Sequence, residues 1–202
     1  MGLTYETRDS NERLENFEWD RIWVQNARDT ATSRLVMIGD SITLGIMETL
    51  NDHIRWQWPA DSYTSSKALD NPNLIPTMRL YLTQEPRRTA IVFNNGLHGW
   101  HLNDSTEYAE YYEQTVAFLQ KEFPDSPLFL SLCTYLRNEE RNERVLARNK
   151  VIRTVAEKFG LPVIDLYTVT KNNADLLARD GVHFSNYRPL CQEVMNHVEH
   201  LM

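Results

Sequence analysis

Ser41 is the first residue in this sequence placed for chemistry, because it follows an apolar run typical of a strand and directly precedes a helical pattern. A serine in that turn exposes its hydroxyl above a sheet, beside the N–H groups and the positive dipole end of the helix. Those groups could stabilise a developing oxyanion. Gly39 lets the backbone turn tightly. The alternative interpretation is a serine that only caps the helix.

A serine hydroxyl becomes a good nucleophile when a base takes its proton, and that base is usually a histidine oriented by a carboxylate. Asp180 and His183 lie three residues apart in a loop that contains Gly181, just before the last predicted helix. We expect them to converge on Ser41 as a Ser-His-Asp triad. Asp165, near the end of a predicted strand, is the alternative carboxylate.

Two histidine pairs have a spacing that also occurs in metal sites, namely His98 with His101 and His197 with His200. Neither pair is accompanied by a matching cluster of cysteines or carboxylates. We therefore predict no metal site. We also expect no cofactor, because the nucleophile, the base and the oxyanion donors can all come from the chain.

Short apolar runs alternate with longer helical patterns along most of the chain, as in a parallel sheet flanked by helices. The N-terminal segment 11–28 places apolar residues at helical spacing, which predicts a helix within an extension of residues 1–30. Predicted strands span 34–38, 53–58, 90–93, 128–133 and 162–164. Predicted helices span 42–50, 73–84, 105–123, 139–159 and 187–200, with Asp104 as a cap and Gly160 as a stop.

The predicted fold is therefore α/β, a three-layer α/β/α sandwich with a five-stranded parallel, flavodoxin-like sheet. The 202 residues fit a single domain, 1–202, and no linker or repeat divides them. In open α/β sheets, ligands bind beyond the carboxyl ends of the strands, so the loops after the strands should form the site.

The composition argues against two classes of partner. A formal net charge of -7 opposes the basic surface that binding to nucleic acid or to an anionic membrane requires. The first ten residues lack the apolar stretch of a signal peptide, which favours a cytoplasmic location, or a secreted or periplasmic one if a leader was removed. Cys133 and Cys191 indicate no disulfide framework. The oligomeric state stays open.

The pattern resembles the SGNH (GDSL-like) hydrolase family over about residue 34 to the end. The family's first block matches Gly39-Asp40-Ser41, and its last block, Asp-x-x-His before the final helix, matches residues 180–183. The resemblance implies a serine esterase. IVFNNGLHGW and DGVHF are also similar to a bacterial subgroup associated with esterified carbohydrates.

The resemblance implies an oxyanion hole made by the Ser41 N–H and two further donors, at which this sequence departs from the family. Where the family's third block has an asparagine, this chain has His98, whose imidazole N–H can also donate, and Asn95 is the alternative. The family's second block supplies a glycine N–H, but residues 59–72 contain no glycine. The N–H of Ser65 or of Ser66 could replace it, and we expect Ser66 to do so.

The expected substrate is a small-molecule or oligosaccharide ester. The enzyme would hydrolyse or transfer a short acyl group, with acetyl as the expected one, from a carbohydrate or similar alcohol. Aromatic rings near predicted strand ends could stack on a sugar, or pack in the core. Alternatives are a lysophospholipase or thioesterase activity, or binding of acylated sugars without cleavage. Candidate substrate contacts are Asp40, Tyr63, Lys67 and Trp100, with Trp56, Trp58 and His101 as further rings.

Overall fold

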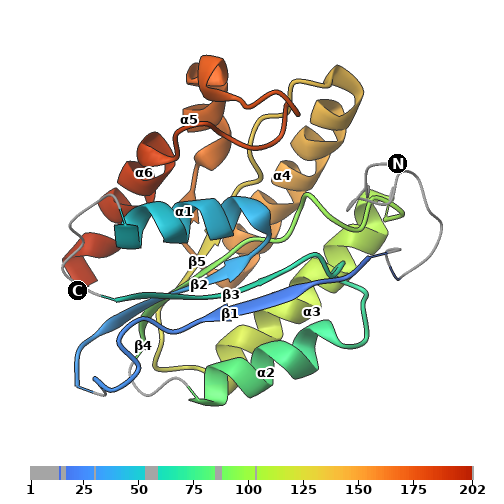
Figure 1. The fold of residues 1–202 in the computed structure, drawn as a ribbon. Helices are drawn as coiled ribbons and strands as arrows, with labels where there is room; N and C mark the ends of the chain where they lie inside the picture. The colour runs from blue at the N-terminus through green and yellow to red at the C-terminus, as the bar shows by residue number, and fades with distance from the viewer. Residues whose placement is uncertain are drawn as a thin grey trace.

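The fold is a mixed sheet of six strands between two layers of helices (Figure 1). The computed structural model describes residue 14 and residues 17–29, 31–52, 59–84, 88–102 and 104–201. The spatial order of the strands is β1-β3-β2-β4-β5-β6. Their bounds are β1 Asp20–Trp23, β2 Arg34–Gly39, β3 Ala60–Ser65, β4 Arg88–Phe93, β5 Leu128–Ser131 and β6 Val163–Ile164.

Five of these strands run parallel, which confirms the predicted α/β class and parallel core, while β1 adds an antiparallel strand at the edge. Gly39 in β2 pairs with Thr64 in β3, and Ile38 pairs with Phe93 in β4. The three strand ends are therefore level. The loops that follow them meet at one edge of the sheet, as expected for an α/β ligand site.

The helices divide between the two faces of the sheet. On one face α1 packs against α6, and α6 packs against α5, whereas α2 and α3 lie on the other face, with α4 beside α3 (Figure 1). This division follows from right-handed crossovers, because the chain moves in opposite directions along the sheet after β2 and after β3. The bounds are α1 Ser41–Asp52, α2 Leu74–Gln84, α3 Ser105–Glu122, α4 Glu139–Phe159, α5 Leu166–Asn172 and α6 Arg188–Val198.

The ends of the helices follow local sequence signals. Asp104 caps α3 by accepting the Thr106 N–H, as predicted, and Asn138 caps α4 by accepting the Arg141 N–H. Gly160 ends α4 in the left-handed region, with φ of 65°. That conformation carries little penalty for glycine, which explains why the helix ends there.

The second strand of the parallel core lies outside the predicted range. Residues 53–58 fall outside the described residues, and the strand that pairs with β2 is Ala60–Ser65. Its sequence, ADSYTS, is mostly polar, although every residue is buried. Asp61 explains part of this, because its carboxylate lies 2.7 Å from the buried Arg34 guanidinium. Alternation of apolar residues could not reveal a strand whose polar groups find tertiary partners.

The predicted N-terminal helix is wrong within the described residues. Asp20–Trp23 forms β1, which pairs antiparallel with Ser62–Ser65 of β3. Ile22 and Trp23, which fit a helical apolar face in the sequence, are 50% and 45% exposed. Their spacing fits a helix, but pairing with a strand about forty positions away decides the conformation of this segment. The rest of segment 11–28 is described only in part.

The structure also shows the state of the two cysteines and whether a described helix could span a membrane. Cys133 and Cys191 are both buried, free thiols. Among the helices of the described residues, none is both long enough and apolar enough to cross a membrane.

The buried pair Arg34–Asp61 gives a first prediction. Asp61→Ala leaves a guanidinium that is 1% exposed without its carboxylate, and it removes the acceptor of the Gln25 N–H. Breaking a buried ion pair by removing one partner costs about 3–5 kcal/mol. We expect urea unfolding to show a loss of this size. Glu122→Ala, which breaks the exposed pair with Arg79, should cost less than about 1 kcal/mol, and equal losses would contradict this account.

Candidate active site

The structure brings Ser41, His183 and Asp180 together at the edge where the parallel strands end. His183 Nε2 lies 2.8 Å from Ser41 Oγ, and His183 Nδ1 lies 2.7 Å from Asp180 Oδ2. Each ring nitrogen thus has one partner. In this arrangement Nδ1 donates to the carboxylate and Nε2 accepts from the hydroxyl, which is the geometry required for proton removal from serine.

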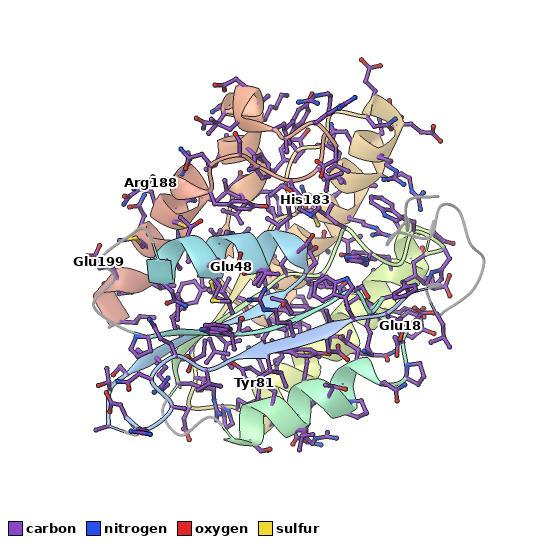
Figure 2. The ribbon with its side chains drawn as sticks, viewed as in Figure 1. Glu18, Glu48, Tyr81, His183, Arg188 and Glu199 are labelled. Carbon is purple, nitrogen blue, oxygen red and sulfur yellow. The ribbon has the colours of Figure 1, made fainter. Side chains whose placement is uncertain are left out.

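Ser41 is the first residue of α1, directly after β2. Asp40 Oδ1 accepts the Ile42 N–H at 2.9 Å, so the side chain before the serine caps the helix. Gly39 cannot carry a side chain here, since a Cβ would lie 2.0 Å from Thr43 Oγ1. This close contact, in addition to the turn itself, explains the glycine. The turn places the Ser41 hydroxyl within hydrogen-bond distance of His183. In Figure 2, His183 lies above the start of α1.

The loop that carries Asp180 and His183 is fastened by Arg137, a residue that sequence reasoning missed. The Arg137 N–H donates to the Gly181 carbonyl at 3.0 Å, and its Nη2 donates to the Leu177 carbonyl at 3.1 Å. Gly181 has φ of 74°, and a Cβ there would lie 2.9 Å from Arg137 Cβ. The Ala178 N–H closes the loop by donating to the His183 carbonyl at 2.7 Å.

Asp180 is held in its ionised form by hydrogen bonds. Burial raises the pKa of this carboxyl, but the bonds from the His183 ring and from the N–H groups of Val182 and His183 outweigh burial and lower the pKa to about 2. The charge is not deeply buried, because the Asp180 side chain is 51% exposed and that of His183 is 38% exposed. The site is therefore open to solvent on the histidine side.

The predicted oxyanion donors differ in the partners that the structure gives them. The Ser66 N–H donates to the Trp19 carbonyl at 3.1 Å, so the prediction that it serves as an oxyanion donor is wrong: the residue just before β1 occupies it. Asn95 Nδ2 donates to the Lys67 carbonyl at 2.9 Å. His98 is 5% exposed, and its ring meets the Trp19 ring edge to face at 6.3 Å. At the start of α1, the Ser41 N–H lacks a partner within the helix.

Arg148, from α4, holds the loop that contains Asn95 and His98. Its guanidinium is 4% exposed and donates to four carbonyls, those of Gly96, His98, Gly99 and Leu102, at 2.6 to 3.3 Å. The same group lies 4.7 Å from the ring centres of Trp100 and Tyr108. A charged residue in a helix rich in charges gives no sequence signal of such burial.

The four predicted substrate contacts are buried, and the structure gives each of them partners within the protein. Asp40 caps α1, and the Tyr63 hydroxyl donates to Asp20 at 2.8 Å from a side chain that is fully buried. Lys67 forms an ion pair with Asp20. Trp100 is 5% exposed beneath Arg141, Arg144 and Arg148. Their assignment to substrate contact is therefore not supported by this geometry.

The structure also shows the partners of the other candidate residues that it describes. His101 Nε2 lies 3.0 Å from Asp70 Oδ1, in a pair whose side chains are 10% and 2% exposed. Asp165 caps α5 and pairs with Arg153 at 2.7 Å, so it is engaged away from His183. Trp56 and Trp58 lie outside the described residues. In the described part of the chain, no three potential ligands gather as a metal site.

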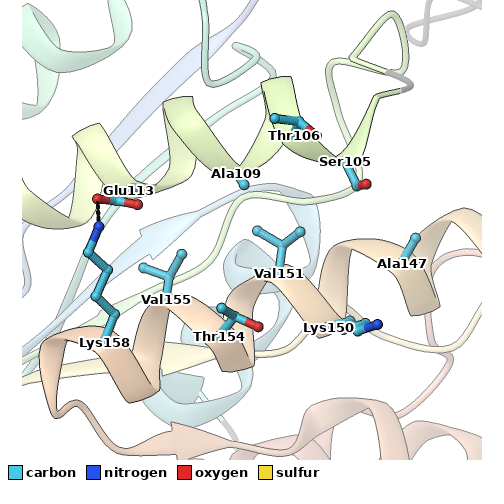
Figure 3. Close-up of a pocket in the computed structure, with 10 residues that line it drawn as sticks. All are labelled: Ser105, Thr106, Ala109, Glu113, Ala147, Lys150, Val151, Thr154, Val155 and Lys158. Atoms are coloured by element: carbon cyan, nitrogen blue, oxygen red, sulfur yellow. Dashed lines mark hydrogen bonds and ion pairs between the residues drawn. The ribbon is translucent and has the colours of Figure 1, made fainter.

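A hollow with a volume of about 550 Å³ runs between α3 and α4 (Figure 3). Alanine and valine side chains line its floor, and an ion pair between Glu113 and Lys158 closes one end. It lies on the outer side of a helix pair and contains neither Ser41 nor His183. Within the described residues, this hollow is therefore separate from the strand-end site that holds the nucleophile and its base.

Solved structures with this fold are numerous. One is an acetyl xylan esterase, 18% identical, with a TM-score of 0.63 over 82% of this chain and 99% of that one. Another is a lipase/acylhydrolase from Enterococcus faecalis, 19% identical, with a TM-score of 0.66 over 83% and 96%. A third, from Veillonella parvula DSM 2008, is a member of the lipolytic protein G-D-S-L family, 16% identical, with a TM-score of 0.63 over 83% and 98%.

No protein-family model matches the sequence, and no curated protein matches it. At these identities the structural likenesses show a shared fold. They confirm the predicted three-layer α/β/α architecture.

Gly181 gives a prediction with a matched control. Gly181→Ala introduces a Cβ at positive φ against Arg137, whereas Gly160→Ala introduces one at φ of 65° with no atom within 4 Å. Backbone strain costs about 1–3 kcal/mol at either site. We expect denaturant unfolding to show a larger loss for Gly181→Ala, by roughly 1 kcal/mol, because of the added contact. Equal losses would show that the contact with Arg137 has no energetic effect.

The ionisation of Asp180 gives another prediction. A carboxyl resonance for Asp180, followed by NMR, should titrate with a midpoint at about 2 rather than at its ordinary value of 3.8. His183→Ala should raise this pKa, because the side-chain hydrogen bond is lost. Since the folded pKa lies below the unfolded one, the stabilisation is present above about pH 4 and is lost as the pH falls through 2. An unchanged midpoint in the variant would contradict the assigned cause.

Proposed function

We propose that this protein is a serine esterase that removes or transfers a short acyl group through Ser41, His183 and Asp180. One observation carries the proposal: His183 Nε2 is 2.8 Å from Ser41 Oγ while its Nδ1 is 2.7 Å from the Asp180 carboxylate. A helix-capping serine alone does not require a histidine held in this way from 142 positions along the chain. The fold shared with solved esterases and acylhydrolases supports the proposal.

In the proposed reaction, His183 Nε2 takes the Ser41 proton as Oγ attacks the ester carbonyl. The imidazolium that forms is stabilised by the ionised Asp180. The carbonyl oxygen becomes an oxyanion near the Ser41 N–H and the loop that Arg148 holds, where His98 and Asn95 are the candidate side-chain donors. His183 then protonates the leaving alcohol, and water releases the acyl group by the same sequence of steps.

For the substrate, we propose an acetyl or other short acyl ester of a carbohydrate or a similar small alcohol. The side chains of His183 and Asp180 are 38% and 51% exposed. Such an open triad suits an ester whose alcohol part extends into solvent. One solved protein with this fold is an acetyl xylan esterase, which agrees with that class. A lysophospholipase or thioesterase is the alternative, and rates over a series of acyl-chain lengths distinguish them.

The proposal is tested by the nucleophile itself. A fluorophosphonate should label Ser41 in the unaltered chain, as mapped by mass spectrometry of its peptides, because only an activated serine reacts. Ser41→Ala should abolish labelling and lower the hydrolysis of a small acetyl ester by at least about 10³-fold.

Ser105→Ala, at the exposed start of α3, is the matched control and should leave both readouts unchanged. Labelling at another serine, or full turnover by Ser41→Ala, would overturn the proposal. Binding of an acetylated sugar with no turnover by the unaltered chain would instead favour a non-catalytic acyl-sugar module.

A further inference from the structure

The strand β1 begins beside an aromatic residue at the edge of the sheet that carries the candidate active site. Because β1 runs antiparallel to the other strands, its beginning lies at the edge where the others end: Asp20 pairs with Ser65, the last residue of β3. In Figure 2, Glu18 marks this end of the strand. The residue just before β1, Trp19, therefore lies at the edge that carries Ser41.

The Trp19 ring contacts the loop that follows β4. Trp19 adjoins β1, which is first in the sheet order, and His98 follows β4, with β3 and β2 between them. Neighbouring strands are about 4.8 Å apart, yet the two rings meet at 6.3 Å. The same loop also reaches the residues after β3, because Asn95 Nδ2 donates to the Lys67 carbonyl at 2.9 Å. The loop and its contact with Trp19 therefore lie beyond the ends of β2 and β3, and Ser41 follows β2 directly. Trp19 stays partly exposed, whereas His98 is 5% exposed beneath it.

Trp19 is also held rigidly. Its N–H donates to Ser66 Oγ at 2.9 Å, and its carbonyl accepts the Ser66 N–H at 3.1 Å. On one side, Glu18 accepts from Asn71 Nδ2 at 2.6 Å. On the other, Asp20 accepts from Tyr63 and Ser65 and pairs with Lys67. These polar bonds fix the backbone that carries the partly exposed ring before any ligand arrives.

From this placement we propose that Trp19 is a specificity-determining residue, the aromatic wall on which the sugar ring of the ester packs. The inference rests on the proposed function and names the part of the site that binds the alcohol. An indole face can cover the C–H face of a pyranose ring. The fixed backbone that carries the indole limits the conformational entropy lost on binding. A small alcohol, such as ethanol, presents no such face.

The test compares two esters, glucose pentaacetate and ethyl acetate, by kcat/KM in each variant. Trp19→Ala should lower the ratio of sugar ester to ethyl ester about tenfold, mainly through KM for the sugar ester. Trp19→Phe, which keeps a ring, should restore part of that ratio. Trp23→Ala, at the far end of the same strand and 45% exposed, is the matched control and should leave the ratio at its original value.

The outcomes separate the two proposals. An unchanged ratio in Trp19→Ala, or the same fall in Trp23→Ala, overturns the role of Trp19 while Ser41-dependent hydrolysis still supports the esterase. An equal loss on both esters, with a lowered melting temperature, also overturns it, because Trp19 then acts only on the fold. No hydrolysis of either ester by the unaltered chain overturns the proposed function and this inference together.

Discussion

The site depends on the contact between His183 and Ser41, two side chains separated by 142 positions in sequence. Each belongs to a short segment whose conformation is fixed elsewhere. Ser41 is set by the buried strand β2 and by the Asp40 cap, while His183 is set by a loop that is closed on itself and tied to Arg137. Small displacements of either segment would break a 2.8 Å bond, so the fold has to hold both.

Arginine side chains hold three irregular segments in place by donating hydrogen bonds to their backbone carbonyls. Arg34 donates to the carbonyls of residues 25, 26 and 29, Arg137 to those of residues 177 and 179, and Arg148 to four carbonyls in the loop after β4. Backbone carbonyls in loops lack the partners that helices and strands provide. A guanidinium has five N–H donors in a rigid fork, so one side chain can satisfy several of them. A lysine offers no such fork.

The sequence was sufficient for the parts of the site that are encoded locally. Ser41 lies in a strand-turn-helix pattern, and Asp180 and His183 lie three positions apart, so each could be found without knowing the packing. Tyr63 and Trp100 carry aromatic rings near predicted strand ends, but the type of ring does not reveal whether it is buried in the folded chain. Arg148 could not be found, because burial of a charge depends on four carbonyls that only the folded loop brings together.

The N-terminal segment shows why local periodicity can fail at a sheet edge. Leu14, Phe17, Ile22 and Trp23 fit a helical spacing, yet each is 45% exposed or more, so the pattern does not mark a buried face. The conformation is set instead by hydrogen bonds from residues 18–20 to side chains and backbone of residues 63–71. These bonds also occupy the Ser66 N–H that the family resemblance had suggested for the oxyanion. The segment that leads into one antiparallel strand thus occupies a predicted backbone donor and places an indole ring at the edge of the sheet where the triad lies.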